Sequence, residues 1–80
     1  MSHMKFIRHK QLGFVIFEKH TDHSAMANYL GGKDQVMSAG FVMSNPAPDE
    51  FAPVVCFGES TTLRMEPGEN DTHSLNSRLA

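Results

Sequence analysis

Four side chains that can bind a metal ion or move a proton lie close together in the chain: Glu18, His20, Asp22 and His23. Imidazole nitrogen and carboxylate oxygen are ligands of zinc, and imidazole titrates near neutral pH. His20, Asp22 and His23 are therefore the candidate metal ligands and the candidate centre of a small metal-dependent or histidine-based hydrolase. Their spacing is not the His-Glu-x-x-His arrangement, so strand-end and helix-capping roles are the competing interpretation.

A catalytic base also needs a nucleophile or a bound substrate beside it, and the side chains of suitable type belong to Cys56, Ser60, Thr61 and Thr62. None of them lies in a Gly-x-Ser-x-Gly elbow, and the run from Gly58 to Thr61 is typical of a turn. Cys56 is the only cysteine, so the chain cannot form an internal disulfide, which favours a reducing compartment. The sequence predicts a cytoplasmic protein without a cofactor.

Eighty residues predict one domain. Residues 1–3 are interpreted as an expression-tag remnant, residues 4–68 as a single α+β domain, and residues 69–80 as a C-terminal tail or short helix. No apolar run is long enough to span a bilayer, and the N-terminus returns to charge too soon for a signal peptide. We therefore expect no membrane contact.

Charge is distributed unevenly between the two halves of the chain. Residues 1–46 hold five basic and three acidic side chains, whereas residues 47–80 hold two basic and six acidic ones. The basic residues are scattered and form no stripe, so nucleic acid is not the expected partner. The halves are expected to attract each other, within one fold or between two subunits.

The elements that position these residues follow from the apolar pattern. Good N-cap residues at Thr21 and Asp22 and a stop at Gly31-Gly32 predict a helix over 22–30. β-Branched and aromatic residues predict strands over 12–19, 35–44, 53–57 and 61–66, with a short strand at 6–7. The order β-α-β-β-β, with an optional C-terminal helix, indicates an α+β fold: one mainly antiparallel sheet of about four strands with a helix packed on one face.

Two local features of the predicted sheet have a stated meaning. The run Ser38-Ala39-Gly40 is unusually small for a strand centre, which indicates a bulge or a close approach by another backbone. The segment 45–53, which contains three prolines, predicts a long loop.

Three of the predicted strands are apolar on both faces, unlike a strand with one wet face. One short helix cannot cover both faces, so either two helices take one face each or a second copy of the chain covers the exposed face. The sequence therefore predicts a homodimer. The candidate interface or ligand-binding residues are the large apolar ones of these strands: Phe14, Ile16, Phe41, Val42, Met43, Val55 and Phe57.

We accordingly expect a non-enzymatic interaction or ligand-binding protein that acts as a homodimer. Its size is typical of small proteins of bacterial genomes and mobile elements. Its partner is a second copy, another protein or a small apolar molecule. The alternative is the hydrolase built on His20, Asp22 and His23.

Overall fold

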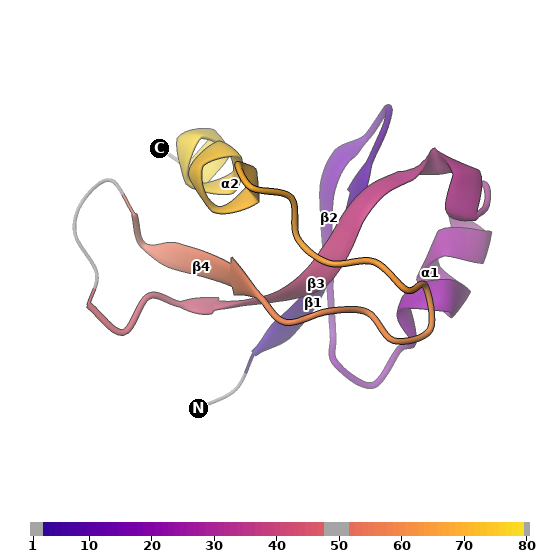
Figure 1. The fold of residues 1–80 in the computed structure, drawn as a ribbon, viewed down its shortest axis with the longest axis horizontal. Coiled ribbons are helices and arrows are strands. Elements are labelled where there is room, and N and C mark those ends of the chain that lie inside the picture. Colours follow the sequence, from indigo (N-terminus) through magenta and orange to yellow (C-terminus); the bar gives the residue numbers. More distant parts are fainter. Residues whose placement is uncertain (1–2, 48–51, 80) are drawn as a thin grey trace.

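The computed structural model describes residues 3–47 and 52–79 of the chain. Its elements, in order, are β1 (Met4–His9), β2 (Gly13–Phe17), α1 (His23–Tyr29), the 3-10 turn η1 (Lys33–Gln35), β3 (Val36–Ser44), β4 (Val54–Phe57) and α2 (Asp71–Leu79) (Figure 1). Every strand pair is antiparallel and the strand order is β2-β1-β3-β4. The predicted α+β fold with a four-stranded antiparallel sheet and a C-terminal helix is confirmed.

The hairpin of β1 and β2 turns through residues 10–12, and Gly13 follows with a φ of +77° that L side chains rarely adopt. The buried His9 ring holds this turn, because its Nδ1 accepts hydrogen bonds from the backbone amides of Gln11 and Leu12. Its Nε2 lies 2.9 Å from the carbonyl oxygen of Leu30, just after α1. One imidazole thus ties the hairpin to the end of the helix.

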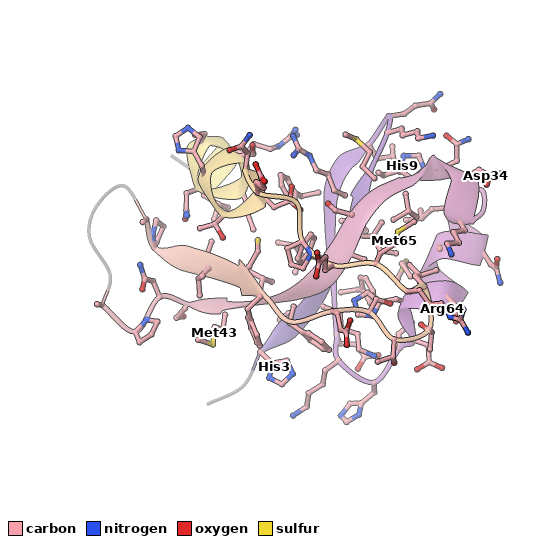
Figure 2. The ribbon with its side chains drawn as sticks, in the orientation of Figure 1. His3, His9, Asp34, Met43, Arg64 and Met65 are labelled. Carbon is pink, nitrogen blue, oxygen red and sulfur yellow. The ribbon has the colours of Figure 1, made fainter. Side chains whose placement is uncertain are left out.

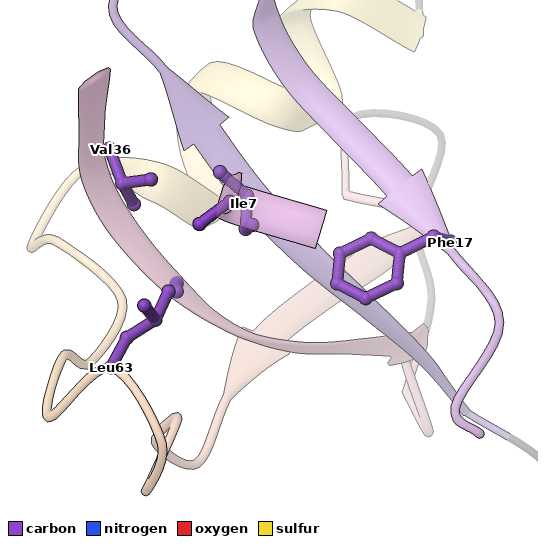
Figure 3. Packing of buried hydrophobic residues seen from close by; sticks show 6 residues of the cluster. Ile7, Phe17, Val36 and Leu63 are labelled. Atoms are coloured by element: carbon purple, nitrogen blue, oxygen red, sulfur yellow. The ribbon is translucent and has the colours of Figure 1, made fainter. Parts of the chain in front are cut away.

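The two helices cover opposite faces of the sheet, which we call the α1 face and the α2 face. Ile7 and Phe6 are adjacent in β1 and therefore point to opposite faces, yet both are fully buried. Ile7 belongs to the cluster that contains Ala27 of α1, whereas Phe6 belongs to the one that contains Leu75 of α2. Figure 3 shows the α1 cluster, with Ile7 between Val36 and Phe17. Each face of the sheet has its own helix, which is the first of the two arrangements that strands apolar on both faces allow. Covering the sheet therefore does not by itself require a second copy.

The strand predicted over 61–66 is not formed. These residues make a turn closed by an isolated bridge between Ser60 and Met65, and Arg64 adopts a φ of +56°. Leu63 is buried against the α1 cluster and Met65 packs beside it. Leu63 and Met65 alternate with polar residues, which is the pattern that predicted a strand. They do so because both side chains reach the same core from one turn. The fourth strand is instead β1, of which the sequence indicated only residues 6–7.

The small residues in β3 make room for a crossing segment, as the sequence indicated. A Cβ added at Gly40 would lie 2.8 Å from the carbonyl oxygen of Phe57 and 2.8 Å from Cγ of Pro67. The segment after β4 therefore passes too close to β3 for any larger residue. Part of the predicted loop over 45–53, namely residues 48–51, lies outside the described residues, as do residues 1–2 of the predicted tag remnant and Ala80.

Neither described helix is long and apolar enough to cross a bilayer.

Candidate interaction surface

The structure does not bring His20, Asp22 and His23 together as metal ligands. His20 and Asp22 are exposed, whereas His23 is only 3% exposed. Its Nε2 lies 2.8 Å from the carbonyl oxygen of Gly40, and its ring packs edge-on against Phe17 and Phe41. Across residues 3–47 and 52–79, no three His, Cys, Asp or Glu side chains are grouped so as to hold a metal ion.

Burial also shapes the acid–base behaviour of His23. Because the ring loses contact with water, its pKa is lowered, and the hydrogen bond to the carbonyl of Gly40 only partly opposes this. Burial in the core therefore favours the neutral imidazole. Asp22 takes the N-cap position of α1, as its residue type predicted, although its side chain makes no capping hydrogen bond.

Glu18, the fourth member of the cluster, stabilises the turn between β2 and α1. Its carboxylate accepts hydrogen bonds from the Thr21 hydroxyl and, at 2.7 Å, from the backbone amide of His20. The Thr21 hydrogen bond is the main reason that the pKa of Glu18 is lowered. Turn formation therefore accounts for the position of this carboxylate.

The candidate nucleophiles are also engaged in structure. Ser60 is buried, and its Oγ accepts a hydrogen bond from the backbone amide of Leu63 inside the 60–65 turn. Cys56 is half-buried in β4, and this burial raises the pKa of its thiol, which disfavours the reactive thiolate. The interpretation of 58–61 as turn chemistry agrees with this geometry.

Asp71 is the polar centre that the sequence did not reveal. It is 2% exposed, and its carboxylate accepts hydrogen bonds from Arg8 Nη1 at 2.9 Å, from Ser38 Oγ at 2.5 Å and from the amide of Gly68 at 2.8 Å. It joins the start of α2 to β1 and β3. The Arg8 guanidinium also lies over the Phe14 ring, 5.0 Å from its centroid. The Arg8–Asp71 ion pair joins residues 1–46 to residues 47–80, the two halves expected to attract each other.

The seven predicted interface residues divide between the two faces. Phe14, Ile16 and Val42 belong to the α2 face, where Val42 is buried in the core and Ile16 remains 43% exposed. The other four lie together on the α1 face, beyond α1, and all four are half-buried. We call them the β3–β4 patch: Phe41, Met43, Val55 and Phe57.

His3 lies on the β3–β4 patch. Its ring packs edge-on against Phe41 and Phe57, with centroid distances of 5.1 and 5.9 Å, and the two phenyl rings lie 5.7 Å apart. Figure 2 shows His3 and Met43 on the same side of the sheet. His3 falls in the segment interpreted as a tag remnant, so a chain without it leaves both rings more open to solvent.

The outer edge of β4 is closed by side chains of α2. Asn76 Oδ1 accepts from the amide of Val54 at 3.0 Å, and Asn76 Nδ2 donates to the Val54 carbonyl at 2.9 Å. Thr72 Oγ1 accepts from the amide of Cys56 at 3.0 Å. One helix thus occupies three of the main-chain groups that a further strand would use. The sequence offered no direct signal for this, because Asn and Thr in a helix are usually exposed.

The outer edge of β2 has no such cover. This strand, Gly-Phe-Val-Ile-Phe, pairs with β1 on one side, and within the described residues no group hydrogen bonds to its other side. Leu12 and Ile16 are 57% and 43% exposed beside it. We call the outward-facing main chain of this strand, with those side chains, the β2 edge.

A shallow open hollow lies within the 59–66 turn, lined by Glu59, Thr61, Arg64, Met65 and Glu66. Figure 2 shows Arg64 and Met65 close to α1, on the opposite side of the molecule from α2. The sequence did not indicate this hollow. Its lining brings one guanidinium and two carboxylates from a single turn, and all three charged side chains are exposed.

Comparison of the chain with protein-family models, with curated proteins and with solved structures finds no match. The assignment of function therefore depends on the geometry alone.

Proposed function

We propose that this chain is a non-enzymatic interaction protein that acts as a homodimer. The observation that carries the proposal is the apolar surface that remains after both helices are in place. Each helix covers only part of its face, so Ile16 and Met4 stay exposed on the α2 face and the β3–β4 patch stays half-exposed on the α1 face. The β3–β4 patch is a contiguous apolar surface, and such surfaces are typical of protein interfaces.

The polar side chains support an interaction role over a catalytic one. His9, His23, Ser38 and Asp71 are buried, and each is engaged in hydrogen bonds that join elements of the fold. Among the described residues, no buried side-chain nitrogen or oxygen lacks a hydrogen-bond partner. The groups best suited to acid–base chemistry therefore already stabilise the fold.

The energetics favour a modest, reversible dimer. Full burial of one exposed Ile or Phe side chain contributes about 1.5–3 kcal/mol, and two-fold symmetry counts each contact twice. The cost of bringing two molecules together is of comparable size, so only the surplus appears as affinity. We expect a dissociation constant in the micromolar range, which corresponds to a standard free energy of binding of about −8 kcal/mol.

Sedimentation equilibrium tests this proposal over a concentration series from low to high micromolar. The expected result is a reversible shift from the monomer mass to the dimer mass. A monomer mass throughout the series would overturn the homodimer. The β3–β4 patch is then the surface on which another protein or an apolar ligand would bind, and a His3→Ala variant should bind a hydrophobic dye more strongly than the parent chain.

A further inference from the structure

We propose that a second copy of this chain pairs with the β2 edge, so that the two sheets join into one continuous antiparallel sheet. The inference rests on the proposed homodimer and names the surface through which it forms. It commits to main-chain pairing at β2 in preference to packing of the β3–β4 patch against itself.

The hydrogen bonds at β4 determine which way the main chain of each strand faces. Val54 and Cys56 direct their amides to α2, so the alternating residues Val55 and Phe57 face β3. The same alternation continues across the residue pairs of β3 and β1 to β2. It directs the N–H and C=O groups of Phe14 and Ile16 away from β1. These are the main-chain groups that a new strand would meet.

The composition of β2 leaves its open edge able to pair with another strand. Natural proteins protect an edge strand with proline, with inward-pointing charge, with a short strand or with a covering element. The four residues after Gly13 are Phe-Val-Ile-Phe, with no proline and no charge. α2 closes the β4 edge by hydrogen bonding, whereas nothing described does so at β2. A partner strand is the cover that this edge lacks.

The β2 sequence is complementary to itself in one antiparallel register. With Val15 on the two-fold axis, Phe14 lies opposite the partner's Ile16, and Ile16 opposite the partner's Phe14. Each such pair exchanges two main-chain hydrogen bonds, which gives about four in all. Both pairs join an aromatic to a β-branched side chain, a favourable combination on one face of a sheet.

The charges that flank the strand allow this register. Glu18 comes opposite the partner's Leu12, and Lys19 opposite the partner's Gln11. No two like charges stand across from each other, so the ends of the paired strands do not repel. A second copy therefore fits the β2 edge in hydrogen bonding, in side-chain shape and in charge.

Three lysine substitutions separate the candidate surfaces. Ile16→Lys places a charge on the β2 edge, Val55→Lys places one on the β3–β4 patch, and Met37→Lys changes an exposed apolar residue of β3 as the matched control. All three are measured by sedimentation equilibrium, with circular dichroism to confirm folding. We expect Ile16→Lys to weaken dimerisation about tenfold or more, and the other two variants to dimerise as the parent chain does.

The outcomes distinguish this inference from the proposal beneath it. A parent chain that stays monomeric overturns both. A dimer that tolerates Ile16→Lys but dissociates with Val55→Lys keeps the homodimer and overturns the β2 pairing. If Ile16→Lys fails to fold, Ile16→Pro replaces it, because proline removes only an amide that faces away from β1. A folded Ile16→Pro chain that dimerises unchanged also overturns the inference.

Disulfide cross-linking tests the register. In a Cys56→Ser chain, Val15→Cys places two sulfurs across the two-fold axis in a non-hydrogen-bonded pair, where Cα atoms lie about 4.5 Å apart, within disulfide range. Lys19→Cys is the control, because antiparallel pairing separates its two copies by on the order of 25 Å. We expect a covalent dimer from Val15→Cys alone. A Val15→Cys dimer without cross-linking, or equal cross-linking at Lys19→Cys, would contradict the register.

Discussion

The two edges of the sheet solve the same problem in different ways. At β4 the amide and carbonyl of Val54 are hydrogen-bonded to Asn76 of α2, and the amide of Cys56 is hydrogen-bonded to Thr72. At β2 the outward main-chain groups of Phe14 and Ile16 make no hydrogen bond within the described residues. A single helix with two polar side chains therefore covers one edge, and the other edge stays open among the described residues. This difference is why we propose the open edge as the surface on which a second copy pairs.

α2 can close the β4 edge because a buried anchor holds its first residue. Asp71 bonds to Arg8 of β1 and to Ser38 of β3, which sets the helix over the α2 face. Leu75 then packs on Phe6 and Val42 beneath it. The position of Asn76 and Thr72 along β4 follows from these contacts.

Removal of the Asp71 carboxylate that anchors α2 should have the largest effect on stability. Asp71→Ala leaves the Ser38 hydroxyl, the Gly68 amide and the Arg8 guanidinium without their acceptor. Arg8 is 30% exposed, so water offsets part of its loss, and the three lost hydrogen bonds together cost about 3 kcal/mol. We expect the free energy of unfolding in urea to fall by that amount, a large share of the stability of a domain this size. Glu69→Ala, at an exposed acid two residues earlier, is the control. Equal stability of the two variants would mean that Asp71 does not anchor α2.

Opening the β4 edge should make it resemble β2. Asn76→Ala leaves the amide and carbonyl of Val54 without the bonds they now make, which costs about 1–3 kcal/mol. Urea unfolding measures the loss, and Ser77→Ala on the exposed side of α2 is the control. We also expect this variant to associate more strongly, because a second edge becomes available for pairing. Unchanged stability would contradict the closing role of Asn76.

Loss of the single hydrogen bond from the Cys56 amide to Thr72 should have a smaller effect, confined to β4. Thr72→Val keeps the shape of the side chain but removes the acceptor of the Cys56 amide, which costs about 1 kcal/mol. Hydrogen exchange at the Cys56 amide is expected to speed up while exchange in β2 stays the same. Equal acceleration on both strands would indicate general loosening instead of local opening at β4.

Lower pH should reduce the stability of the fold through the buried His23, without a separate effect on the β2 or β4 edge. The pKa of His23 is lowered in the folded chain, so the unfolded chain binds a proton first as the pH falls below about 6.5. His23 therefore contributes stability above that pH that is lost progressively below it. We expect the urea midpoint to fall between pH 7 and pH 5, and to fall less in His23→Gln. The exposed His20→Gln is the control, and an equal pH dependence in both variants would contradict the assignment.

The sequence was sufficient for the elements with a strong local signal. The helix at 22–30 and its stop at Gly31-Gly32 appear within one residue, because capping and glycine chemistry are local. The small residues before Phe41 correctly indicated a close backbone approach. The strand at 61–66 was wrong, because Leu63 and Met65 enter the core from a turn.

The candidate site was less accessible from the sequence, because it depends on which helix covers which strand. The predicted list of large apolar interface residues mixed Val42, which is core, with Ile16, which is exposed. The closure of β4 depends on Asn76 and Thr72, whose partners lie about twenty residues away in sequence. No local pattern carries such a contact.

Amide hydrogen exchange, followed residue by residue in a dilute and in a concentrated protein solution, shows directly whether α2 protects the β4 edge and a second copy protects β2. We expect the amides of Val54 and Cys56 to be protected equally at both concentrations, because α2 protects them within one molecule. We expect the amides of Phe14 and Ile16 to exchange rapidly when dilute and to become protected when concentrated. Exchange at Phe14 and Ile16 that does not depend on concentration, in a sample whose mass shows dimer, would contradict pairing at the β2 edge.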